Sequence, residues 1–301
     1  MKYTELEACQ ICPRKCGVNR NEGNVGVCGQ TKEIRVARAA LHAWEEPCIS
    51  GKEGSGAVFF SGCNVGCVFC QNRKIAKEGY GKILTIQELA EVFLRLQDKG
   101  ARNINLVTPT HYILQIRDAL ILAKEKGLRI PIVYNTSGYE LVESLRLLEG
   151  LVDIYLPDCK YISEELSAKY SQAKDYFFYA SQAIHEMVRQ VGEVEFDENG
   201  IARKGVIVRH LLLPGHVKEG KAVLSYLHEN FGKQIYISIM NQYTPFPYVK
   251  EHYPEIDRKV TKREYERLLS YALDIGIENG FMQEGDTAKE SFVPAFDGEG
   301  V

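Results

Sequence analysis

The sequence predicts an α/β protein built around a partial barrel of parallel strands, with a small cysteine-rich module before it. From Ala57 onward, six short apolar runs alternate with amphipathic helical segments. Continuous apolar runs are typical of parallel strands that helices cover on both faces. Polar residues gather at the carboxyl end of every run. That convergence is the arrangement of a barrel active site, so it favours a barrel over a doubly wound sheet.

Composition divides the chain into three parts. Residues 1–52 hold a closely spaced set of cysteines and few periodic apolar residues, so we expect a separate cysteine-rich metal module there. Residues 53–255 carry the alternating pattern of the barrel, and residues 256–301 a last helix and a tail. The total of 301 residues is within the range of one α/β barrel with such additions.

The predicted strands are the six apolar runs. They span residues 57–60, 103–107, 131–134, 152–156, 206–212 and 235–240. Because a helical crossover joins each run to the next, the strands are expected to be parallel.

The predicted helices carry their own start and stop signals. The helices at 85–100 and 261–276 open with Thr-x-x-Glu capping boxes and end at glycines. The remaining crossover helices are expected at residues 112–127, 139–149, about 163–190 and 217–231.

Charge and hydropathy exclude several partner classes. The formal net charge is −3 with both signs interspersed, which gives no basic field for nucleic acid and no patch for a membrane surface. No run approaches the ~20 apolar residues that cross a bilayer, and the first residues lack an apolar signal segment. We therefore expect a soluble, cytoplasmic protein. Seven of the nine cysteines fall into two closely spaced sets, which in that reducing compartment indicates metal or redox chemistry rather than disulfides.

Three of the cysteines follow the first predicted strand. Cys63, Cys67 and Cys70 have the spacing Cys-x3-Cys-x2-Cys, and no fourth cysteine stands close by in the sequence. Three thiolates can hold three irons of a [4Fe–4S] cluster and leave the fourth iron open, which is typical of a catalytic metal. The alternative is a closed zinc site that recruits Cys48 or Cys159, although both are better explained as packed thiols.

This spacing, with an aromatic residue before the third cysteine, resembles the signature of the radical S-adenosylmethionine (radical SAM) enzymes. The resemblance implies that S-adenosylmethionine occupies the open iron. It also implies that reductive cleavage of S-adenosylmethionine yields a 5′-deoxyadenosyl radical, which abstracts hydrogen from a substrate. Phe69 and Asn72, which flank Cys70, are then expected at the cofactor.

Residues 57–245 further resemble the pyruvate formate-lyase-activating branch of these enzymes, whose fold is a partial (β/α)6, TIM-like barrel. The segment LPDCK matches an Asp-x-Lys motif of that branch, which implies that Asp158 and Lys160 contact the cosubstrate. Arg209 matches the arginine of its fifth strand. The segment Asn-Gln-Tyr-Thr at 241–244 stands in place of Leu-Pro-Tyr-His, and Gln242 is the contact expected there.

The largest departure from this branch follows the second strand. Members usually have Gly-Gly-Glu there, whereas this chain reads VTPTHY. We expect Thr108 to contact the cofactor and Thr110 to cap the next helix. Asn135, in the segment NTSG after the third strand, is expected to reach the ribose or the methionine, with a turn as its alternative role.

The N-terminal cysteines form a second set, Cys9, Cys12, Cys16 and Cys28. Four sulfurs suit either zinc or an auxiliary iron–sulfur cluster, and the spacing leaves the two about equally favoured. The set would hold a lid on the barrel or relay electrons.

Three functions compete at this point. The first is a radical enzyme that places a glycyl radical on a partner enzyme, and the second performs the same chemistry on a small molecule or peptide. Both imply an electron donor such as flavodoxin or ferredoxin. The third is a non-catalytic zinc-binding interaction protein. His42 and Trp44, just before the barrel, could line the site or belong to the core.

Overall fold

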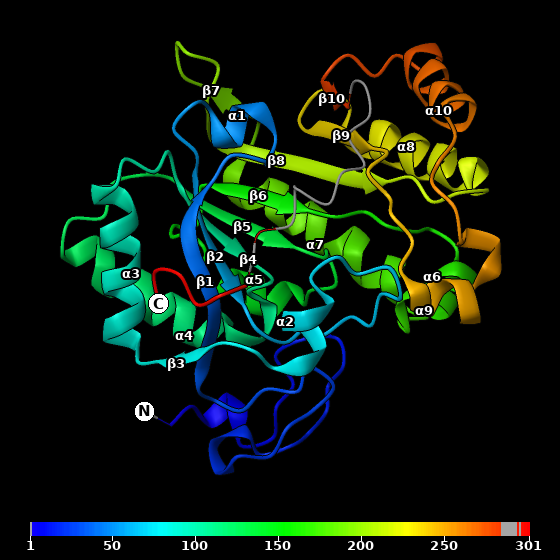
Figure 1. Ribbon diagram of the computed structural model, residues 1–301. Helices are drawn as coiled ribbons and strands as arrows, with labels where there is room; N and C mark the ends of the chain where they lie inside the picture. Colours follow the sequence, from blue (N-terminus) through cyan, green and yellow to red (C-terminus); the bar gives the residue numbers. More distant parts are fainter. Residues whose placement is uncertain (1, 284–293, 295) are drawn as a thin grey trace.

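One curved sheet organises the molecule, in a computed structural model that describes residues 2–283, 294 and 296–301 (Figure 1). Its strand order is β10-β9-β8-β6-β5-β4-β2-β1-β3, and β7 pairs with β8 beside this path. The parallel strands at its centre are β2 (Ser55–Phe60), β4 (Ile104–Val107), β5 (Ile132–Thr136), β6 (Ile154–Pro157), β8 (Ala202–Leu211) and β9 (Tyr236–Met240). All six predicted strands are confirmed, and their parallel order is that of a partial barrel.

Within the described residues, four strands were not predicted from the sequence. They are β1 (Ile34–His42), β3 (Lys82–Leu84), β7 (Glu195–Phe196) and β10 (Gly280–Met282). The longest, β1, runs antiparallel to both β2 and β3. Its register shifts between Val36 and Arg38. Such a bulge interrupts the alternation of buried and exposed side chains, so the period-two pattern that identifies a strand is lost.

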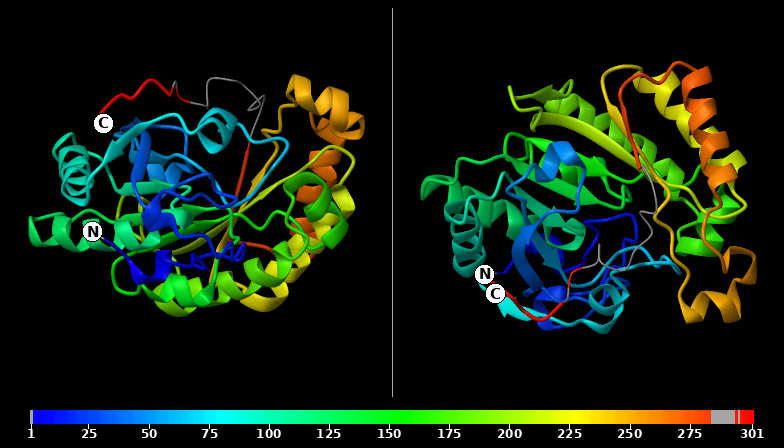
Figure 2. Two further views of the ribbon diagram at one scale, coloured as in Figure 1. Left: turned by 90° about the horizontal axis from the view of Figure 1, so that it is seen from below. Right: turned by 45° about the horizontal axis from the view of Figure 1, so that its top comes forward.

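Helices cover the outer side of the sheet, from α3 and α4 at one end to α8 and α10 at the other (Figure 2). Their bounds are α3 (Ile86–Asp98), α4 (Ile113–Glu125), α5 (Val142–Arg146), α6 (Glu164–Ser171), α7 (Tyr176–Val191), α8 (Val217–Phe231) and α10 (Lys262–Asp274). Shorter helices are α1 (Pro47–Ser50), α2 (Arg73–Glu78) and α9 (Pro247–His252). Both predicted capping boxes are present, at the start of α3 and of α10.

The single helix predicted at about 163–190 is wrong, because the chain forms α6 and α7 instead. The break follows Gln172, which has a left-handed φ of 53° and ends α6. α7 then begins at Tyr176, whose hydroxyl accepts from the backbone of Lys160 and donates to the carbonyl oxygen of Ser137. The break therefore brings a buried tyrosine against the ends of two strands.

Two arginines are among the residues that tie the first thirty or so residues to the barrel. Arg20, only 1% exposed, donates to the carbonyl oxygens of Gln30 at 3.0 Å, Thr31 at 2.6 Å and His111 at 2.7 Å. Arg14 reaches the carbonyl oxygen of Asn64 at 2.7 Å, inside the three-cysteine loop. The N-terminal segment is thus tied directly to the barrel.

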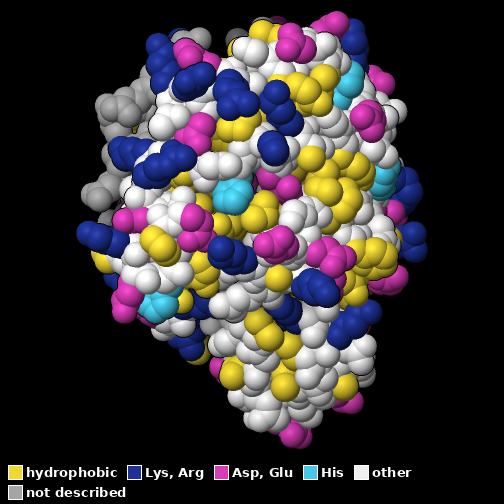
Figure 3. Space-filling view, turned by 90° about the vertical axis from the view of Figure 1, so that its right-hand side faces the viewer, with side chains coloured by type: hydrophobic (Ala, Val, Ile, Leu, Met, Phe, Trp, Pro, Cys, Tyr) yellow, Lys and Arg dark blue, Asp and Glu magenta, His cyan; other side chains and the backbone are white. Residues whose placement is uncertain are grey.

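The surface carries no broad field of one charge on the face drawn in Figure 3, where basic, acidic and apolar side chains are intermixed. In the part of the chain that the structure describes, no helix has both the length and the apolar character to cross a membrane.

Arg20→Ala is expected to lower the unfolding free energy by about 3 kcal/mol, because it leaves buried carbonyl oxygens without donors. Urea denaturation of this variant, beside the control Arg129→Ala at an exposed position, measures the effect. Equal stability of the two variants would contradict the role given to Arg20.

Candidate functional site

A cavity of about 250 Å³ opens at the carboxyl ends of the parallel strands. Every residue that the sequence assigned to the cofactor or to the three-cysteine site lines it. These residues are Cys63, Cys67, Cys70, Phe69, Asn72, Thr108, Asn135, Asp158, Lys160, Arg209 and Gln242. They converge because parallel strands end at one edge of the sheet. Their individual roles stay predictions.

The loop after β2 presents the three thiols to this cavity. Gly62 opens the loop with a φ of +89°, and a Cβ there would lie 2.6 Å from the carbonyl oxygen of Cys28. Burial raises the pKa of Cys63 to about 12 and that of Cys70 to about 11, and the neighbouring thiols contribute to both shifts. Without a bound cation, Cys63 and Cys70 are therefore neutral thiols that share one environment.

The thiols are gathered but are not arranged as ligands. Among residues 2–283, 294 and 296–301, no group of three or more His, Cys, Asp or Glu side chains has the geometry of a metal site. Cys67 lies 3.0 Å from the Ser171 hydroxyl, and Cys63 accepts from the backbone of Val65 at 3.4 Å. Three sulfurs on one wall of a cavity nevertheless fit a group that takes three sulfur ligands and keeps one position open.

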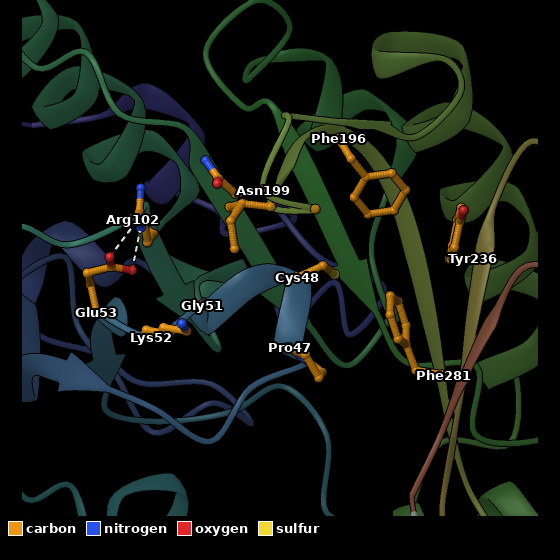
Figure 4. A pocket seen from close by; sticks show the side chains of 12 residues that line it. Pro47, Cys48, Gly51, Lys52, Glu53, Arg102, Phe196, Asn199, Tyr236 and Phe281 are labelled. Atoms are coloured by element: carbon orange, nitrogen blue, oxygen red, sulfur yellow. Dashed lines mark hydrogen bonds and ion pairs between the residues drawn. The ribbon is translucent and has the colours of Figure 1, made fainter.

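Neither candidate for a fourth sulfur lies at this cavity. Cys48 lines a separate pocket, of about 800 Å³, beside the residues that precede β2, β4 and β8 (Figure 4). That pocket is therefore at the amino ends of the parallel strands. Cys159 is fully buried in the main core. Both are packed thiols, as the sequence suggested, and the closed zinc site that would recruit one of them has no support.

The charged side chains of Asp158, Lys160 and Arg209 line the cavity, and we call this group its floor. The carboxylate of Asp158 accepts hydrogen bonds from Lys160 Nζ at 2.5 Å and from Arg209 Nε at 3.2 Å. Burial alone would raise the pKa of Asp158, but the two cations outweigh it and lower that pKa below its usual value. Asp158 in turn raises the pKa of Lys160 against the opposing effect of burial. All three groups are thus charged at neutral pH.

Glu45 also lines the cavity, a position that was not predicted from the sequence. Its carboxylate is 3.3 Å from Arg209 Nη1 and accepts from the Asn105 amide at 3.1 Å. It precedes the first recognised strand, so no local pattern marked it. His42 and Trp44 line the same cavity. Trp44 is 57% exposed, which excludes the alternative that it belongs to the core.

The backbone at Thr108 is strained. Its φ is +60°, a left-handed conformation that β-branched residues rarely adopt. Its N–H donates to the carbonyl oxygen of Asn135 at 2.9 Å, which ties the ends of β4 and β5 together. Strain of this kind persists only where the surroundings enforce it, and it is concentrated at functional sites.

Thr110 does not cap a helix, contrary to the expectation. Its hydroxyl donates instead to Glu140 at 2.6 Å, and Thr136 donates to the same carboxyl group. Burial raises the pKa of Glu140 to about 7, although these hydrogen bonds oppose the shift. A buried carboxyl group behind the cavity thus joins the ends of β4 and β5.

Three more of the predicted residues line the cavity. Phe69 packs edge-on against Tyr243, with ring centroids 5.9 Å apart. Asn72 precedes α2 and makes no cap hydrogen bond with its side chain. Gln242 accepts from the Gln283 amide at 3.1 Å.

The N-terminal cysteines lie together, next to the three-cysteine loop. Burial raises the pKa of Cys12 to about 12, and the nearby thiols of Cys28 and Cys9 add to the shift. Cys16 accepts from the backbone of Val27 at 3.4 Å. The close approach of Cys28 to Gly62 places this set directly behind the loop.

The family model described as "Radical SAM superfamily" matches residues 57–227. An uncharacterised protein of Methanocaldococcus jannaschii is 31% identical over 274 residues, which cover 88% of this chain and 74% of that protein. The pyruvate formate-lyase-activating enzyme of Clostridium pasteurianum is 32% identical over 113 residues, covering 36% of this chain and 46% of that enzyme.

Among solved structures, SuiB of Streptococcus suis bound to S-adenosylmethionine superposes with a TM-score of 0.51 at 15% identity. The match covers 74% of this chain and 48% of SuiB, so the chain spans about half of that protein. At this identity the likeness concerns the fold.

Thr108→Gly is expected to raise the unfolding free energy by about 1 kcal/mol, because glycine adopts the left-handed conformation without strain. Thr108→Ala, which keeps a Cβ, is the control and should gain less. Thermal unfolding of both variants tests this. A glycine variant less stable than the wild type would show that the backbone at Thr108 is not strained.

Glu140→Gln is expected to change how stability depends on pH. Between the ordinary pKa of 4.5 and the raised value of about 7, the folded chain keeps a proton at Glu140 that the unfolded chain releases. The contribution of Glu140 to the unfolding free energy of the wild type therefore falls as pH rises through that window, by up to about 3 kcal/mol. Glutamine removes this slope.

Urea denaturation at about pH 5 and about pH 8 measures the slope, because these values bracket most of the window. The exposed control Glu143→Gln should behave as the wild type. Parallel pH profiles for Glu140→Gln and the wild type would contradict the assignment.

Proposed function

Because the chain belongs to the radical SAM superfamily, which implies a [4Fe–4S] cluster and S-adenosylmethionine, we propose that Cys63, Cys67 and Cys70 hold the cluster and that the cavity beside them binds S-adenosylmethionine. The observation that carries this proposal is the shared cavity: the three thiols and the charged floor line one space at the carboxyl ends of the strands. When bound, the cofactor pair supplies reductive cleavage to a 5′-deoxyadenosyl radical, for hydrogen abstraction from a substrate.

The residues of this chain prepare the cavity for a ligand that carries both charges. Asp158, Lys160 and Arg209 present fixed charges of both signs, which suit the amino and carboxylate groups of an amino acid. Their pairing keeps the charges in place before a ligand arrives, so little reorganisation is needed on binding. Thr108, Asn135 and Gln242 add polar groups around the charges.

Apolar side chains enclose the other walls. Phe69, Val107, Leu211 and Met240 line the cavity, and all but Leu211 are no more than 9% exposed. Such walls exclude water and strengthen the electrostatic interactions inside. They would also protect a radical from solvent.

We propose an oxidoreductase similar to the pyruvate formate-lyase-activating enzymes. The match to such an enzyme from Clostridium pasteurianum and the Asp158–Lys160 pair support this. A glycyl radical enzyme would be the partner, and a flavodoxin or ferredoxin of the cytoplasm would donate the electron. The alternative is the same chemistry on a small molecule or peptide, which the sequence VTPTHY favours because it departs from Gly-Gly-Glu.

For the N-terminal set we propose a second metal, either zinc or an auxiliary iron–sulfur cluster. The effects of the Cys28 and Cys9 thiols on the pKa of Cys12, and the position of Cys28 next to Gly62, support a common site. A cluster there would lie in the path of an electron to the cavity, whereas zinc would only stabilise the segment.

Replacing Cys63, Cys67 and Cys70 together with alanine is expected to remove about four irons from anaerobically reconstituted protein, because a [4Fe–4S] cluster loses its ligands. Iron, sulfide and zinc analysis measures this, and Cys48→Ala serves as the control that should keep the full complement.

The metal that the triple variant retains identifies the N-terminal site. Zinc would assign it a structural metal, and about four further irons an auxiliary cluster. A colourless wild-type protein that binds zinc alone would overturn the radical function in favour of a zinc-binding interaction protein.

A further inference from the structure

Glu45 enters the cavity from outside the region that defines the family. The family model begins at residue 57, whereas Glu45 lies between β1 and α1. Its backbone N–H donates to the Ser50 hydroxyl at 3.0 Å, and Pro47 begins α1 two residues later. These contacts hold the segment in one conformation and direct the carboxylate to the floor of the cavity, where it lines the same space as the three thiols.

Glu45, Arg209 and Asn135 form a closed triangle of polar contacts. Arg209 Nη1 lies 3.3 Å from Glu45 Oε2, and Arg209 Nη2 donates to Asn135 Oδ1 at 2.5 Å. The Asn135 amide nitrogen closes the triangle by donating to Glu45 Oε1 at 3.5 Å. Glu45 therefore acts on both partners: it holds one edge of the guanidinium, and it determines which way the Asn135 amide points.

The remaining edge of the guanidinium is held by Asp158. Arg209 Nε donates to that carboxylate at 3.2 Å, and Asp158 is shared with Lys160. A guanidinium is a rigid fork, so partners on three of its nitrogens leave it a single orientation. The carboxyl groups of Asp158 and Glu45 face the two cations of this group; burial raises the pKa of Glu45, and Arg209 opposes that shift.

Glu46 also lies near Arg209, where, against the effect of burial, its charge raises the pKa of Arg209 together with the charges of Asp158 and Glu45. Glu46 is 8% exposed, and burial raises the pKa of its carboxyl group, against the effect of Arg209. Of the two neighbouring glutamates, Glu45 makes the ion pair with Arg209 within 4 Å.

We propose that Glu45 is a positioning residue for S-adenosylmethionine, which acts by holding Arg209 and Asn135 in the orientation that receives the ligand. The proposal rests on the function proposed above. It means that the segment before the barrel completes the cofactor site, and that the family's own region is insufficient for full affinity in this protein.

The test measures S-adenosylmethionine affinity by equilibrium dialysis on the anaerobically reconstituted full chain. Glu45→Gln keeps the shape and an acceptor for the amides but removes the charge, so it is expected to weaken binding about tenfold, the value of one charge-assisted hydrogen bond. The matched control is Glu53→Gln, which removes a carboxylate from its paired Arg102 at the other pocket (Figure 4) and should leave affinity unchanged.

A double-mutant cycle separates positioning from general destabilisation. Arg209→Lys keeps the positive charge but loses the fork. If Glu45 acts through Arg209, adding Glu45→Gln to Arg209→Lys should cost less than about twofold in affinity, because coupled residues are not additive. Thermal unfolding and the absorption spectrum of the ligand-free cluster should match the wild type in Glu45→Gln. If that variant does not accumulate, Glu45→Asp, which withdraws the charge from Arg209, replaces it in the cycle.

The outcomes distinguish the two proposals. A wild-type chain that reconstitutes without iron, or that does not bind S-adenosylmethionine, overturns the proposed function and this inference with it. A wild type that binds both, with Glu45→Gln of equal affinity, overturns the inference alone. The inference is also overturned if the affinity losses of the two single variants multiply in the double variant. Such independent losses indicate a loss of structure rather than positioning through Arg209.

Discussion

The charged group at the floor of the cavity is the constraint on which the site depends. Arg209, on β8, meets Asp158 at the end of β6, Asn135 on β5, and Glu45 from the segment before α1. Buried charges cost several kcal/mol each unless they are paired with good geometry. The strand ends must therefore meet within hydrogen-bond distance, and the same distances that satisfy the charges bring the three-cysteine loop beside them.

The segments outside the parallel strands are built into this site rather than attached to it. β1 adds an antiparallel strand next to β2; its last residue, His42, and the segment after it, with Trp44 and Glu45, line the cavity. The N-terminal cysteine segment lies against the loop itself, where the carbonyl oxygen of Cys28 takes the space that a side chain at Gly62 would need. A substitution in either segment therefore alters the surroundings of the cavity.

Two threonines show where reasoning from short patterns succeeds and where it fails. Thr108 was expected at the cofactor and does line the cavity, but its left-handed backbone carries no mark in the sequence. Thr110 is of a residue type that often caps helices, yet its hydroxyl donates to Glu140, which lies thirty positions further along the chain. A cap is satisfied by neighbours in sequence, whereas this contact exists only because β4 and β5 are adjacent.

The sequence by itself determined the six parallel strands, both capping boxes and the residues that converge at the cavity, because periodicity, caps and motif spacing are local properties. It missed β1, whose bulge removes the alternation, and the division between α6 and α7. Only the tertiary structure assigned Glu45 to the site. Glu45 and Arg209 are 164 positions apart, and an attraction between charges over that separation has no local pattern. This attraction arises only when folding buries both side chains together at the cavity.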